Sequence, residues 1–288
     1  MNSRLKGVIA SFIGILAMVS LIACGKEDTH QGNNNTVSES NQSQKGTLTM
    51  AGSTSMEKLA NVAAEAFMEK YPDVMVSAEF IGSSAGIEAV IAGTVNIGNT
   101  SRPLKDSERN AGVVENVVAI DGIAIILDKT NTITNITKDQ LIQIFRGEIN
   151  NWKHIGGMNQ PIVVVGRESG SGTRGAFEEL LEIKDQGRYS NEINSTGGVM
   201  AKVASTPGAI GYVSIDVLND SVLAVSIDGS EPTEANIKEG SYLLSRPFVM
   251  ATFGEVSAQP KVVQDFFGYL SSEEGKELIK SVGLITVD

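Results

Sequence analysis

Cysteine, histidine and positive charge are all scarce in this sequence of 288 residues. It has one cysteine and two histidines, and aromatic residues make up only 5% of it. A single cysteine excludes a disulfide framework within the chain, and so few sulfur and imidazole ligands exclude a zinc-type metal constellation. The 23 Lys and Arg residues face 34 Asp and Glu residues, which gives a net charge of −11. Nucleic-acid binding needs a basic face, so we expect no nucleic-acid partner.

Long apolar runs are also rare, and the longest one lies at the N-terminus. Residues 1–23 combine a basic start with a short apolar stretch, as a secretory signal peptide does. The stretch ends in Leu-Ile-Ala-Cys, which resembles a bacterial lipobox and implies cleavage before Cys24 and a lipid (a diacylglyceryl thioether with palmitate-type chains) on its sulfur. An ordinary signal peptide or an uncleaved anchor is the alternative. The polar residues 24–46 then predict a flexible linker behind the lipidated cysteine.

From Thr47 onward the sequence alternates strand-like and helix-like segments. Apolar residues at helical spacing alternate with short β-branched runs, and the near-continuous apolar run Val117–Leu127 is typical of a strand covered on both faces. This alternation predicts an α/β fold. The expected strands are 47–51, 74–81, 117–127, 161–165, 209–213 and 243–251. The expected helices are 56–71, 85–93, 137–145, 173–182, 197–204, 260–271 and 272–281.

Three small polar turns each stand between an expected strand and an expected helix. They are Gly52-Ser53-Thr54-Ser55, Gly82-Ser83-Ser84-Ala85-Gly86 and Ser169-Gly170-Ser171-Gly172-Thr173. Each offers free backbone N–H groups, hydroxyl donors and the positive end of a helix dipole. Ordinary helix capping explains any one of them. Three together, one of them flanked by Arg167 and Arg174, indicate a site for an oxyanion.

Other chemistries fit these residues less well. The glycine-rich turn 168–172 lacks the lysine that a nucleotide-binding loop places after its last glycine. Ser171 has a serine rather than a glycine two residues before it, so it is not a hydrolase elbow, and His154 lies in a polar loop. A carboxylate-based enzyme stays an alternative, although no pair of acidic residues stands out.

Six short motifs follow one another along the chain: AGSTSM at 51–56, IGSSAG at 81–86, IGNTSRPL at 97–104, IFRGEINNW at 144–152, RESGSGT at 167–173 and PGAIGYV at 207–213. Taken in this order, they resemble the extracytoplasmic phosphate-binding protein of bacterial phosphate ABC transporters. The resemblance implies a two-lobed, periplasmic-binding-protein-like fold of type II, each lobe a mixed sheet flanked by helices. It implies lobe one at 47–122 plus 246–288 and lobe two at 123–245, joined by two hinge crossings near Asp121 and Leu244.

The resemblance also places a phosphate-contacting role on particular residues. These are Thr54, Ser55, Ser83, Arg167, Ser171, Gly172 and Thr173. Arg167 is expected to offer a guanidinium fork to two phosphate oxygens. Ser53 and Ser84 are expected to cap helices, and Trp152 is expected to pack in lobe two.

One position departs from the family pattern. Many relatives have an aspartate where this chain has Ser101, and that aspartate accepts the phosphate proton and excludes sulfate. Ser101 is therefore included among the contacts, and Asp121, a carboxylate within an apolar run, is hypothesised to be the acceptor. Capping of local backbone amides by Asp121 is the alternative, and Glu168 is the fallback acceptor.

Taken together, the resemblance implies high-affinity capture of inorganic phosphate outside the membrane and its delivery to an ABC importer. The expected partners are phosphate, the permease and ATPase subunits of the importer, and the membrane through the lipid on Cys24. No catalysis, cofactor or metal is expected, and the protein is expected to be a monomeric substrate-binding lipoprotein on the outer face of the cell membrane. The alternatives are a binder of another tetrahedral oxyanion such as sulfate, a secreted phosphoryl-transfer enzyme, and a lipid-anchored sensor or adhesin.

Overall fold

Strands and helices alternate along the computed structural model, which describes residues 45–287; the predicted signal peptide, Cys24 and the linker up to residue 44 lie outside them. The strands are β1 (Gly46–Gly52), β2 (Val74–Glu79), β3 (Ile97–Thr100), β4 (Val113–Val114), β5 (Val117–Leu127), β6 (Asn135–Ile136), β7 (Val163–Arg167), β8 (Asn191–Ile193), β9 (Ala209–Ser214), β10 (Leu223–Ile227), β11 (Ser245–Phe253) and β12 (Ile285–Thr286). The α-helices are α1 (Glu57–Lys70), α2 (Ser83–Ile91), α3 (Asp106–Asn110), α4 (Lys138–Phe145), α5 (Gly172–Leu180), α6 (Thr196–Ala204), α7 (Glu234–Lys238), α8 (Lys261–Ser271) and α9 (Glu273–Ser281). Single 3-10 turns are η1 (Thr54–Met56), η2 (Trp152–Ile155), η3 (Ile215–Val217) and η4 (Val256–Ala258).

The principal strands form one mixed sheet in the order β2-β1-β3-β11-β5-β9-β7-β8. At one end β1 is parallel to both β2 and β3, and at the other end β7 is parallel to both β8 and β9. The strands in the middle are antiparallel, since β11 runs against β3 and β5, and β5 runs against β9. The mixed α/β sheet predicted from the sequence is thus confirmed.

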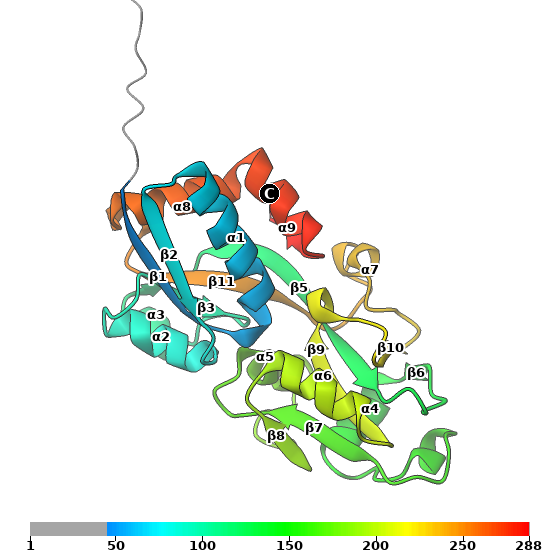
Figure 1. The fold of residues 1–288 in the computed structure, drawn as a ribbon. Coiled ribbons are helices and arrows are strands. Elements are labelled where there is room, and N and C mark those ends of the chain that lie inside the picture. Colours follow the sequence, from blue (N-terminus) through cyan, green and yellow to red (C-terminus); the bar gives the residue numbers. More distant parts are fainter. Residues whose placement is uncertain (1–44, 288) are drawn as a thin grey trace, which may run out of the picture. The chain divides into compact units, whose positions relative to one another are not determined.

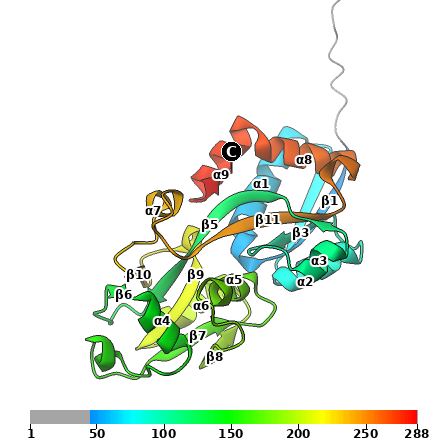
Figure 2. The ribbon, with the colours of Figure 1, turned by 180° about the vertical axis from the view of Figure 1, so that it is seen from behind.

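The long strands β5 and β11 run side by side between the two ends of this sheet (Figures 1 and 2). Their antiparallel register places Gly122 opposite Ser245 and Asp121 opposite Arg246. Each of the two strands also pairs with a strand on its other side, β11 with β3 and β5 with β9. These two strands are therefore the only long strand connections between the two ends of the described sheet.

Two separate groups of apolar side chains cover the two ends of the sheet. The first core includes Leu48 and Phe67 together with Phe266 and Leu284 from the end of the chain. The second core consists almost entirely of residues 123–244 and includes Phe177. The lobe boundaries at 122 and 246 stay a prediction, which this separation of cores supports.

Helices cover both faces at each end of the sheet. In the first part, α1 and α8 contribute to the first core, while Ile87 of α2 joins a smaller cluster on the opposite face. In the second part, α4 and α5 contribute to the second core, and Val199 and Val203 of α6 pack on the other face. Burial on both faces explains why Val117–Leu127 is so continuously apolar.

Local signals decide where individual elements begin. Thr137 caps α4: its hydroxyl accepts a hydrogen bond from the backbone N–H of Gln140, and the Gln140 side-chain oxygen accepts one from the backbone N–H of Thr137. The buried Trp152 packs in the second core, and its Nε1 donates to the Gly208 carbonyl at 3.0 Å. Among the described residues no helix is both long and apolar enough to cross a bilayer.

Candidate oxyanion-binding site

The three polar turns meet at the junction between the two parts of the sheet. The first turn is η1, capped by the Ser53 hydroxyl, the second opens α2 after Gly82, and the third opens α5, which Ser171 caps. The first turn follows β1, the second follows β2 and the third follows β7. Each thus lies at the carboxyl end of a strand from one of the parallel pairs β1–β2 and β7–β8. Helix starts gathered in this way present unpaired N–H groups toward a common point.

Side chains from the turns contact each other across the junction. The Ser55 hydroxyl lies 2.7 Å from the Thr173 hydroxyl, a pair separated by 118 positions in the chain. The backbone N–H of Ser84 donates to the Gly170 carbonyl at 3.1 Å. The first and second turns thus both touch the third.

Gly172 lies against the two serines that the sequence analysis placed in the site. A Cβ at this position would lie 2.3 Å from Ser83 Oγ and 2.8 Å from Ser101 Oγ. Such distances are far below contact distance, so this approach requires a glycine. The Ser101 N–H donates to Ser83 Oγ at 3.3 Å, which joins these two residues as well.

The cluster is closed off from solvent. It consists of the side chains of Thr54, Ser55, Ser83, Ser101, Arg167, Ser171 and Thr173. Each of these residues is at most 6% exposed. Ser53 Oγ donates to Ser101 Oγ at 2.8 Å, so the Ser101 oxygen accepts and its own proton remains free to donate elsewhere. A buried group of donors with spare protons can hold an anion that has lost its hydration.

Arg167 supplies the positive charge of the cluster. It is the last residue of β7, and its guanidinium is only 2% exposed. Both oxygens of Glu168 accept from it, at 3.0 Å from Nε and 2.9 Å from Nη2, which fixes the plane of the guanidinium. Its Nη1 donates to the Thr196 hydroxyl at 3.2 Å. Glu168, the fallback acceptor, is therefore already engaged with this cation.

Asp121 lies next to this cluster but does not join its hydroxyl network. Its Oδ1 accepts from Ser214 Oγ at 2.6 Å, and its Oδ2 lies 2.7 Å from Arg246 Nη2 and 2.9 Å from Nε. Arg246 Nη1 in turn donates to the Ser101 carbonyl at 3.1 Å. Complete burial raises the pKa of Asp121, and the Arg246 charge and the Ser214 hydrogen bond oppose that shift. A backbone hydrogen bond from Ile215 also lowers this pKa, so Asp121 has a backbone partner as well as Arg246 and Ser214.

Sequence reasoning missed two residues that contact the predicted ones. Thr196 opens α6 after β8, and its turn Ser195-Thr196-Gly197-Gly198 repeats the small polar pattern of the other three. Arg246 is a lone charge at the start of the apolar strand β11, as Asp121 is within β5. The small polar turn and the single charge in an apolar run are both visible in the sequence. Neither lies within the motifs on which the family resemblance rests.

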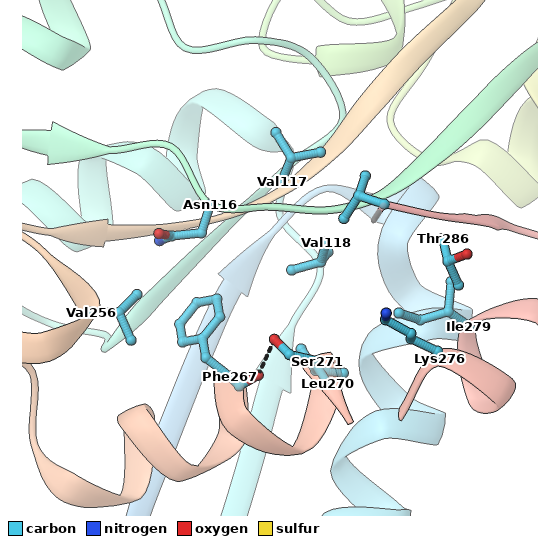
Figure 3. A pocket seen from close by; sticks show the side chains of 11 residues that line it. Asn116, Val117, Val118, Val256, Phe267, Leu270, Ser271, Lys276, Ile279 and Thr286 are labelled. Atoms are coloured by element: carbon cyan, nitrogen blue, oxygen red, sulfur yellow. Dashed lines mark hydrogen bonds between the residues drawn. The ribbon is translucent and has the colours of Figure 1, made fainter. Parts of the chain in front are cut away.

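The described residues also line cavities outside this buried cluster. One of about 610 Å³ adjoins the cluster at Ser171, and two of its cations, Arg102 and Arg174, are paired with Glu108 and Glu178. Another of about 470 Å³ lies between β5, α8 and α9, where Lys276 is the charged group among mostly apolar side chains (Figure 3). In residues 45–287 no group of His, Cys, Asp and Glu side chains is suited to hold a metal ion.

Comparison with known proteins places the chain in a family. Residues 37–274 match the family model described as the PBP superfamily domain. The phosphate-binding protein PstS of Bacillus subtilis is 34% identical over 284 residues, which cover 97% of this chain and 92% of that protein. The chain belongs to the phosphate-binding proteins of the PBP superfamily.

Solved structures of phosphate-binding proteins share the fold. A Clostridium perfringens protein described as a phosphate ABC transporter substrate-binding protein, crystallised with bound phosphate, has 39% identity and a TM-score of 0.79. A phosphate transport receptor from Vibrio cholerae has 34% identity and a TM-score of 0.71. Each comparison covers 84% of this chain and all of the other. The two-lobed α/β architecture expected from the sequence is confirmed.

Proposed function

We propose that this protein captures inorganic phosphate outside the cell membrane and delivers it to an ABC importer. The observation that carries the proposal is the buried cluster in which three helix starts and the Arg167 guanidinium converge. Backbone N–H groups and hydroxyls satisfy the oxygens of a tetrahedral anion, and a guanidinium fork matches two of them. The names of the relatives, phosphate-binding proteins of transporters, support phosphate as the ion.

Binding rather than catalysis fits the side chains present. The cluster offers hydroxyl and N–H donors, but a nucleophilic serine needs an adjacent general base. The carboxylates beside it, Asp121 and Glu168, are each engaged with an arginine. His154, the histidine of residues 45–287, is exposed in η2. We therefore propose a substrate-binding protein without turnover of its ligand.

Selection of phosphate over sulfate depends on which side chain accepts the hydrogen bond from the protonated phosphate oxygen. Monohydrogen phosphate carries a P–OH donor and sulfate carries none, so a site built from donors alone does not separate them. Asp121 and Glu168 keep lone pairs beyond those used by their arginines, and Ser101 Oγ already accepts from Ser53. Asp121 stays our proposed acceptor. A binder of sulfate or another oxyanion is the second candidate, and the Ser101 position is the observation that favours it.

The site residues and the anchoring are part of the proposal. We propose that the anion is contacted by Thr54, Ser55, Ser83, Ser101, Arg167, Ser171, Gly172 and Thr173.

We also propose that a lipid on Cys24 holds the protein at the membrane beside its permease. Replacing Cys24 with Ala is expected to release the protein from the membrane fraction of an expressing bacterium. A protein that stays membrane-bound after this change contradicts the anchor.

Calorimetry with phosphate and sulfate near pH 7 tests the binding proposal. We expect tight one-to-one phosphate binding and no heat from sulfate. Arg167→Lys keeps the charge but loses the fork, so the dissociation constant is expected to rise roughly 10- to 100-fold. Arg188→Lys is the matched control, since Arg188 is an exposed arginine, and it is expected to bind like the wild type.

Each other outcome has a definite meaning. Equal heats for the two ions select the broad oxyanion binder and reject an acceptor carboxylate. Unchanged affinity in Arg167→Lys rejects the site assignment while leaving phosphate binding intact. If neither ion binds, the proposed function is wrong and the sensor or adhesin alternative gains support.

A further inference from the structure

Thr196 is a buried hydroxyl placed at the centre of the predicted site without belonging to any of its motifs. It is the first residue of α6 and is 1% exposed. It follows β8, which runs parallel to β7 with Ile193 opposite Arg167. The chain therefore leaves β8 at the same sheet end where β7 delivers Arg167 and the third turn.

The contacts of Thr196 join three of the predicted anion-binding residues. Its hydroxyl oxygen lies 2.8 Å from Ser55 Oγ and 3.1 Å from Thr54 Oγ1, and it accepts from Arg167 Nη1 at 3.2 Å. Its backbone N–H donates to Thr54 Oγ1 at 3.2 Å. The residue thus connects the guanidinium of the second part of the sheet to the first turn, which belongs to the first part.

Counting hydroxyl protons shows that this network has donors to spare. Three contacts link the hydroxyls of Thr54, Ser55, Thr173 and Thr196, and each contact uses one of their four protons. At least one proton is therefore left without an acceptor among these oxygens. The free protons of Ser83 and Ser101 add to the surplus, because both oxygens already accept from neighbours. An anion is the acceptor that balances such a group.

We propose that Thr196 is a further residue of the anion site: its oxygen positions Arg167 Nη1, and its hydroxyl completes the network with Thr54 and Ser55 whose surplus proton is donated to the bound oxyanion. This inference rests on the proposed phosphate binding and deepens it. Thr196 makes its contacts to both parts of the sheet at once, so it stabilises the arrangement in which they close on the ion. Its loss is expected to weaken binding rather than to unfold the chain.

The test compares three variants with the wild type by phosphate calorimetry and by thermal unfolding with and without phosphate. Thr196→Val keeps the shape of the side chain and the backbone N–H but removes the hydroxyl. Thr196→Ser keeps the hydroxyl. Ser195→Ala is the matched control, because Ser195 caps the same helix by accepting from the N–H of Gly198 at 3.2 Å.

We expect Thr196→Val to raise the phosphate dissociation constant roughly 10- to 100-fold, as the loss of a hydrogen bond to a charged partner does. The phosphate-induced rise in melting temperature is expected to shrink in parallel. Thr196→Ser is expected to stay within about threefold of the wild type. Ser195→Ala is expected to lower the melting temperature without phosphate while its affinity stays within the same range.

Three results overturn the inference and leave the proposed function standing. Wild-type affinity in Thr196→Val shows that the hydroxyl is not used. Equal weakening in Thr196→Val and Ser195→Ala shows that only the start of the helix matters. Failure of Thr196→Ser to recover binding shows that the methyl group, not the hydroxyl, is needed. Absence of phosphate binding by the wild type itself refutes the proposed function, and this inference with it.

Discussion

Replacing Asp216 with Asn is expected to stabilise the phosphate-free protein, and more so as the pH rises. Asp216 lies in η3 and is 8% exposed, and its carboxylate has only a weak contact with the Ser214 hydroxyl, which donates to Asp121 at 2.6 Å. Burial, and then the charge of Asp121, raise its pKa from the ordinary 3.8 to about 7. The Ser214 hydroxyl opposes this rise in pKa without cancelling it, as do Lys58, whose Nζ donates to the Asp216 carbonyl, and Arg246.

The sign and size of the effect follow from this pKa. The folded state holds the Asp216 proton up to about pH 7 and the unfolded state releases it near pH 4. The contribution of Asp216 to the free energy of unfolding is therefore highest below pH 4 and falls as the pH rises toward 7. Above pH 7 it no longer changes with pH. The full difference corresponds to at most about 4 kcal/mol, at 1.36 kcal/mol per pH unit. Asparagine mimics the neutral acid at every pH.

Urea unfolding at several pH values measures this effect. The free-energy advantage of Asp216→Asn over the wild type is expected to grow by about 2–3 kcal/mol between pH 5 and pH 8, most of it below pH 7. Asp220→Asn removes the same charge from an exposed position four residues later and serves as the control. An advantage that does not change with pH, or an equal one in Asp220→Asn, refutes the reasoning.

Two further predictions concern the junction between the two parts of the sheet. Gly172→Ala is expected to weaken phosphate binding at least roughly 100-fold in calorimetry, because the new Cβ overlaps Ser83 and Ser101; Gly170→Ala, which meets nothing within 4 Å, is the control, and normal binding by Gly172→Ala contradicts the close approach. Arg246→Met leaves Asp121 buried without its cation, so the free energy of unfolding at pH 7 is expected to fall by about 3–5 kcal/mol. Adding Asp121→Asn to Arg246→Met is expected to restore part of it, and no recovery contradicts a paired role.

Local patterns in the sequence predicted the elements that form the framework of the site. The strand expected at 117–127 has those bounds, and the helix expected at 137–145 spans 138–145 with Thr137 as its cap. The three turns were recognised because each combines a strand end, small donors and a helix start, which are features of neighbouring residues. β3 was missed as a strand, since its four residues include the polar Asn99 and Thr100 and read as part of a turn.

Contacts between distant segments could not be predicted in the same way. The Asp121–Arg246 pair depends on the register of two strands 125 positions apart, and the Thr54–Thr196 contact spans 142 positions. The small polar turn around Thr196 resembles the other three, but its residues do not say which distant side chains it contacts. Its place becomes clear only when the parallel pairing of β7 and β8 brings the two turns to one sheet end.

The late position of β11 in the chain has a consequence for how the protein is assembled during synthesis. β11 stands between β3 and β5, yet about 120 residues of other structure are made after β5 and before it. The first core also needs Phe266, Ile279 and Leu284 from the last helices and the segment after them. A nascent chain therefore cannot complete its N-terminal half until nearly all of it has been synthesised. The first core therefore stays incomplete through most of synthesis, and an incompletely folded polypeptide is the form that can thread through a narrow translocation channel.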